Sequence, residues 1–238
     1  MTSEPTSSEM TLDPQPTGSD TSTTAEPVTT GVESAGQDPT CDQQPQILYL
    51  AFDGETLSTS KRNVDNAPQR IAADPSIAGT YGPYQATDRA QLLGAVRSHF
   101  LPFDLCVTDE EPTAPNYDML VVTSDAFPDA GAKAVAYTKE DCENATNNNV
   151  NVLFLSETLG LDPAGRAIAI SNTAGRFYGL VSLDPPVPED LMNPFVGETK
   201  STAVFTDACH PVSNTRCRPT ECDSEGQNSF ALLTAAFE

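Results

Sequence analysis

The sequence predicts a mixed α/β domain, of the α/β or α+β class, behind a polar leader. Three apolar runs have the length and composition of buried strands: 47–52, 117–123 and 150–155. Two longer stretches have helical character, because apolar side chains recur at helical spacing before residue 100 and Ala and Ile are frequent between 164 and 181. Strands that alternate with helices indicate a layered fold in which helices cover a sheet.

Residues 1–46 differ in composition from the rest of the chain. They contain eight acidic residues and no Lys or Arg, and they are otherwise rich in Thr, Ser, Pro and Gly. Such a segment has no apolar periodicity to bury, so it cannot compensate for the entropy lost on ordering. We therefore expect a disordered acidic leader over 1–46 and one folded domain over 47–238.

The first half of the domain is expected to contain a strand, a loop and a helix. The strand 47–52 ends at the turn signal Asp53-Gly54, and the polar, Pro-containing stretch 55–85 is predicted to be a long ordered loop. Thr87 or Asp88 can cap the first helix, which Pro102 ends. The apolar face of this helix is formed by Leu92, Leu93, Val96 and Phe100.

The second half begins with three predicted strands and ends with two helices. The strands are expected at 104–108, 117–123 and 150–155. Pro163 is a typical first residue of a helix, and the helical pattern continues to about 181. A Pro-rich segment, a cysteine loop over 207–226 and a terminal helix over 229–237 come next.

The charge disfavours two classes of partner, nucleic acids and anionic membrane surfaces. Thirty-four acidic residues against 12 basic ones give a formal net charge of −22, whereas the phosphate backbone of nucleic acids is bound by clustered Lys and Arg. An anionic membrane surface is disfavoured for the same reason. No run of 18 apolar residues occurs, so no membrane span is expected.

The six cysteines favour disulfides over zinc. The spacing of Cys209, Cys217 and Cys222 lacks the paired C-x2-C knuckles of a zinc ribbon. We expect one local bridge within 209–222, and the sequence leaves the remaining pairing open. Disulfides indicate an oxidising compartment, hence an extracellular, cell-surface or periplasmic location, although no signal peptide is visible.

Only two histidines occur, which excludes a three-His zinc site. His99, near the end of the first predicted helix, is expected at the surface or in a capping role. His210 lies beside Cys209, where a role as a metal ligand stays open. The oxygen-rich stretch 141–149 lacks the central Gly and final Glu of an EF-hand, which favours a solvated loop over a calcium site.

Two segments resemble a known family. Residues 172–182 read N-T-A-G-R-F-Y-G-L-V-S, and residues 190–194 read D-L-M-N-P. The first is similar in frame to the metzincin zinc-peptidase motif H-E-A-G-H-x-x-G-x-x-H, and the second resembles the family's Met-turn, which places Met192 beneath the metal. The order of predicted elements also resembles a metzincin catalytic domain.

The resemblance implies a zincin-like fold with a mixed sheet, two long helices and a C-terminal helix. Gly179 is retained, but the first His is replaced by Asn172, the Glu by Thr173, the second His by Arg176 and the third by Ser182. It therefore implies no catalytic residue, no cofactor and no bound metal. The alternative is an ordinary buried helix whose glycines allow close packing.

We accordingly expect a catalytically inactive peptidase homologue whose cleft binds a peptide or protein. The alternatives are a secreted metallopeptidase or hydrolase that is still active through a non-standard site, and a structural surface protein. Arg176 is expected to occupy the former metal position and to pair with Asp184, Glu189 or Asp190. The ligand and the oligomeric state are left open.

Overall fold

The computed structural model describes residues 41, 44–59, 64–127, 136–137, 141–142, 148–156, 159–212, 222 and 226–237. The prediction for the leader falls almost entirely outside this set, as do those for residues 143–147 and for much of the cysteine loop. Cys41, near the end of the predicted leader, is buried and disulfide-bonded to Cys106.

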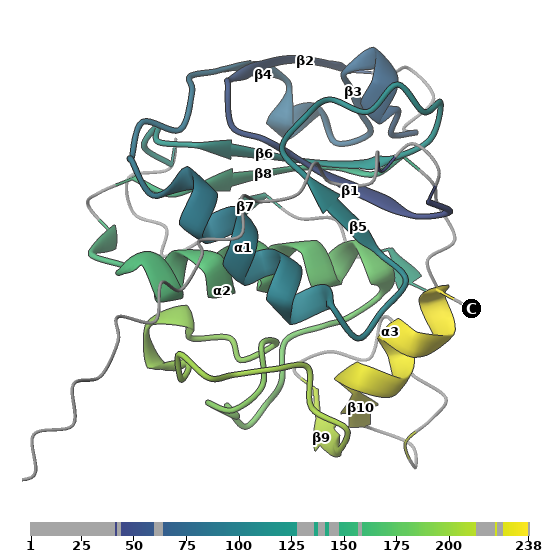
Figure 1. Cartoon of the computed structure of the whole chain (residues 1–238), viewed down its shortest axis with the longest axis vertical. Helices are drawn as coiled ribbons and strands as arrows, with labels where there is room; N and C mark the ends of the chain where they lie inside the picture. The colour runs from purple at the N-terminus through teal and green to yellow at the C-terminus, as the bar shows by residue number, and fades with distance from the viewer. Residues whose placement is uncertain are drawn as a thin grey trace, which may run out of the picture. The chain divides into compact units, whose positions relative to one another are not determined.

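The central sheet has five strands in the order β5-β1-β6-β8-β7 (Figure 1). Neighbouring strands are parallel except for β7, which runs antiparallel to β8 at one edge. The mixed α/β class is thereby confirmed. The strands are β1 Ile47–Ala51, β5 Cys106–Thr108, β6 Asp118–Thr123, β7 Ala136–Tyr137 and β8 Val150–Phe154.

Both faces of this sheet are covered, which explains the continuous apolar runs in the sequence. Every residue of β1, β6 and β8 is buried. Because side chains alternate along a strand, Leu48 and Leu50 pack with the helices, whereas Tyr49 packs with the layer formed by residues 55–81. Figure 1 shows two helices, α1 (Arg89–Phe100) and α2 (Pro163–Gly175), on one side of the sheet. On the other side it shows three short strands, β2 (Glu55–Thr59), β3 (Ile71–Ala72) and β4 (Gly79–Tyr81).

The prediction of a long loop over 55–85 is wrong, because strands form between residues 55 and 81. The segment forms a three-stranded sheet, β3-β2-β4, with β2 Glu55–Thr59, β3 Ile71–Ala72 and β4 Gly79–Tyr81, and short 3-10 turns at Ala67–Gln69 and Pro75–Ile77. Only Leu57 of β2 is buried. The strands are therefore too short and too exposed to give an apolar run, and packing on the central sheet determines their structure.

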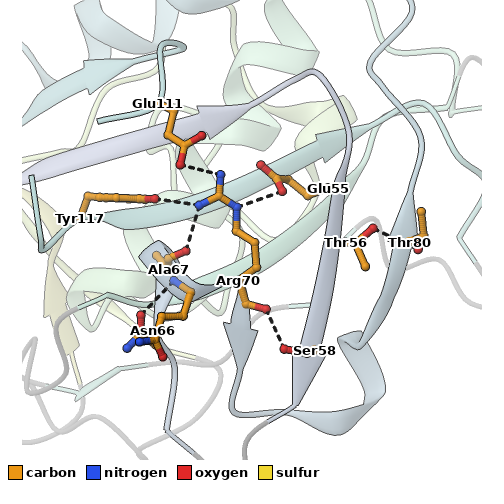
Figure 2. Close-up of polar contacts among 10 residues, drawn as sticks. Glu55, Thr56, Ser58, Asn66, Ala67, Arg70, Thr80, Glu111 and Tyr117 are labelled. Carbon is orange, nitrogen blue, oxygen red and sulfur yellow. Dashed lines mark hydrogen bonds and ion pairs between the residues drawn. The ribbon is translucent and has the colours of Figure 1, made fainter. Parts of the chain in front are cut away.

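The Arg70 guanidinium connects β2 of this small sheet to residues next to the central sheet (Figure 2). Its guanidinium contacts Glu55 Oε2 at 3.0 Å and Glu111 Oε1 at 2.8 Å, and it donates to the Tyr117 hydroxyl at 3.0 Å. A further hydrogen bond from the guanidinium reaches the carbonyl of Ala67 at 3.4 Å. Arg70 has a φ of 54°, so the side chain is aimed from a left-handed turn that few non-glycine residues adopt.

Helix α1, Arg89–Phe100, buries the four apolar residues predicted for it. Asp88 precedes it but makes no capping hydrogen bond. Its carboxylate instead accepts from the Tyr84 hydroxyl at 2.8 Å and pairs with Arg166 of α2 at 2.9 Å. Asp88 therefore joins the two helices.

The expectation of a surface or capping role for His99 is wrong. Its Nδ1 lies 2.7 Å from the Ser171 hydroxyl of α2, and burial lowers the pKa of the imidazole. The ring is half-buried at the contact between α1 and α2, which sequence spacing within α1 could not indicate.

Helix α2 begins as predicted and ends earlier than predicted. It spans Pro163–Gly175, and the Asp162 carboxylate accepts from the Gly165 amide at 2.7 Å as the N-cap. A 3-10 turn over Arg176–Tyr178 comes next, and Gly179, with a φ of 84°, ends the helical path. The prediction that the helix continues to 181 is therefore wrong, because a left-handed residue reverses the chain.

The chain closes with a hairpin and a helix. Strands β9 Cys209–Pro211 and β10 Gly226–Asn228 pair antiparallel, and α3 Ser229–Phe237 comes after them as predicted. The local bridge is confirmed as Cys209–Cys222. Within the described ranges, no helix is long and apolar enough to cross a bilayer.

Candidate functional site

The predicted site residues lie where α2 ends and the chain turns back. We call residues 172–182 the frame segment and residues 190–194 the Asp190 loop. The Leu180 amide donates to the Gly175 carbonyl at 3.1 Å, and Gly179 provides the left-handed turn between them. The frame segment is therefore a helix end followed by a sharp reversal.

Met192 of the Asp190 loop packs directly against Gly175. A Cβ atom added at Gly175 would lie 3.0 Å from Met192 Sδ and 3.1 Å from Leu180 Cδ1. Only glycine permits this approach without a shift of its neighbours. Met192 is fully buried, so its thioether lies beneath the last turn of α2.

Asn172 holds the Asp190 loop against the helix. Its side-chain amide donates to the Leu191 carbonyl at 2.7 Å and to the Asn193 carbonyl at 3.2 Å. Asn172 is 8% exposed and the neighbouring Thr173 is 3% exposed. The amide protons of Asn172 are thus directed to backbone carbonyls, which gives this side chain a structural role.

The reversal brings Arg176 and Ser182 together. Arg176 Nη2 donates to Ser182 Oγ at 2.5 Å, although six residues separate them. Val181, next to Ser182, is fixed on both sides by the buried Gln227, whose Oε1 accepts from the Val181 amide at 2.8 Å and whose Nε2 donates to the Val181 carbonyl at 3.1 Å. The side chains at positions 176 and 182 are therefore in contact, whereas the side chain of Asn172 is directed to the Asp190 loop.

Two of the three carboxylates expected to pair with Arg176 have other partners. Glu189 forms an ion pair with Lys200. Asp190 accepts from the Met192 amide at 2.7 Å and from the amide and hydroxyl of Thr206 at 3.1 and 2.5 Å. Asp190 thus shapes its own loop.

His210 contacts the Asp190 loop indirectly. Its Nε2 lies 3.1 Å from Thr206 Oγ1, and the Thr206 hydroxyl donates to Asp190. In a Ser–His–Asp triad the imidazole lies between nucleophile and carboxylate, whereas here the hydroxyl lies between the other two. Since the hydroxyl proton is directed to Asp190, His210 cannot serve as its base in this arrangement.

Among the residues that the structure describes, the predicted site residues neither form a cluster of metal ligands nor line the hollow found at the other end of α2. No group of three or more His, Cys, Asp or Glu side chains is placed to hold a metal ion among the described residues. A hollow of about 270 Å³ lies at the opposite end of α2, between residues 160–168 and 196–201. None of the six predicted site residues lines it.

No family model matches the chain, and no curated protein matches it in sequence.

Sequence reasoning missed two residues that fix the frame segment. Gln227 and Asp190 are fully buried polar residues that connect three separated stretches of chain. Asp190 also contacts the Ser229 hydroxyl at 3.3 Å, at the start of α3. Gln227 has no local signal, whereas the position of Asp190 two residues before Met192 is typical of a side chain that accepts from its own turn.

Proposed function

We propose that this protein is a catalytically inactive relative of the metzincin peptidases that binds a peptide or a partner protein at the frame segment. The observation that carries the proposal is the contact between Arg176 and Ser182, the positions that correspond to the second and third zinc-binding histidines. The packing of Met192 beneath Gly175 and the left-handed turn at Gly179 support it.

The chemistry of the replacements argues against zinc in this frame. The guanidinium of Arg176 stays charged at physiological pH. At about 4 Å and an effective dielectric near 20, it would repel a divalent cation by about 8 kcal/mol. Thr173 cannot act as the general base, because an aliphatic hydroxyl keeps its proton near neutrality. Binding without cleavage therefore fits these side chains better than hydrolysis.

An exported location belongs to the same proposal. Two disulfides, Cys41–Cys106 and Cys209–Cys222, occur among the described residues, and disulfides persist in oxidising compartments. An extracellular, cell-surface or periplasmic protein can present Arg176 and Ser182, the two partly exposed residues of the frame segment, to peptides outside the cytoplasm.

Metal content tests the alignment on which the proposal rests. In the variant Asn172→His, Thr173→Glu, Arg176→His, Ser182→His, the full ligand set should bind one zinc ion per chain, measured by plasma mass spectrometry after dialysis. The matched control Asn172→Gln, Thr173→Ser, Arg176→Gln, Ser182→Asn perturbs the same positions without zinc ligands. If the folded His variant binds no more zinc than this control, the alignment of residues 172–182 with the zinc-binding motif is wrong. Stoichiometric zinc in the wild type would contradict the assignment as an inactive homologue.

Binding itself is tested with a displayed peptide library on the disulfide-intact protein. A selected peptide should bind Arg176→Glu at least about tenfold more weakly than the wild type. This factor corresponds to a loss of about 1.4 kcal/mol in the binding free energy. Lys200→Glu reverses an exposed charge elsewhere and should leave affinity unchanged. Failure to select any peptide favours a purely structural surface protein, and cleavage of the selected peptide favours an active hydrolase.

A further inference from the structure

We draw no further inference here: the strongest candidate, the hollow of about 270 Å³ between the start of α2 and residues 196–201, lies at the N-terminus of a helix, and nothing in the described part of the chain shows what would occupy it.

Discussion

Asp190→Asn is the substitution that most directly tests how the frame segment is supported. Asp190 is fully buried, and each of its carboxylate oxygens accepts from two donors. Oδ1 accepts from the Met192 amide and the Ser229 hydroxyl, and Oδ2 from the amide and hydroxyl of Thr206. The change keeps the size of the side chain but replaces one acceptor oxygen with a donor.

The cost arises from the donors left without an acceptor. An asparagine side chain can serve one pair of donors and must direct its own amide at the other pair. Each buried donor that loses its partner costs about 1–3 kcal/mol, so we expect a loss of about 2–5 kcal/mol in the free energy of unfolding. For a domain of this size that corresponds to a decrease of about 5–15 °C in Tm.

Urea unfolding followed by tyrosine fluorescence and circular dichroism measures the loss, because the chain has no Trp. Glu189→Gln is the matched control: it removes the adjacent carboxylate, which is exposed and pairs with Lys200, and it should leave the midpoint unchanged. If both variants unfold at the same urea concentration, Asp190 does not organise its loop and our account of the frame segment is wrong.

Three further predictions concern the helices and the small sheet. Gly175→Ala should cost about 1–3 kcal/mol, measured by the same unfolding, because its methyl group collides with Met192; a cost no larger than that of an exposed Gly94→Ala control would contradict the close approach. The wild type should lose stability between pH 7.5 and 5.5, and His99→Gln should remove this loss. Because the His99 pKa is lowered in the folded state, its contribution to the free energy of unfolding is present above the ordinary pKa of 6.5 and disappears as pH falls. If the free energy of unfolding depends on pH equally in both proteins, this reasoning is refuted. Arg70→Met should cost about 1–3 kcal/mol because Glu55, largely buried, loses its cation, and Arg70→Lys should restore only part of it; full restoration by Lys would show that the forked geometry of Figure 2 is unimportant.

Local sequence was sufficient for the elements whose signals are local. The central strands are buried on both faces, so β1, β6 and β8 are continuous apolar runs that the sequence displays directly. The start of α2 was predictable because Asp162 and Pro163 occupy the cap and first positions. The Cys209–Cys222 bridge was predictable because its partners are near each other in the chain.

The tertiary structure alone decided the features that depend on partners distant in sequence. The short strands of the 55–81 sheet form because the central sheet needs cover, not because their own residues are apolar. Helix α2 ends at Gly175 because Gly179 turns the chain and Gln227, 46 residues beyond Val181, holds Val181 in the reversed direction. The partners of Asp190 and His99 likewise come from other elements. Hydrogen bonds and burial depend on where a chain folds back on itself, and that proximity is a property of the whole fold, whereas propensity, periodicity and capping are properties of neighbouring residues.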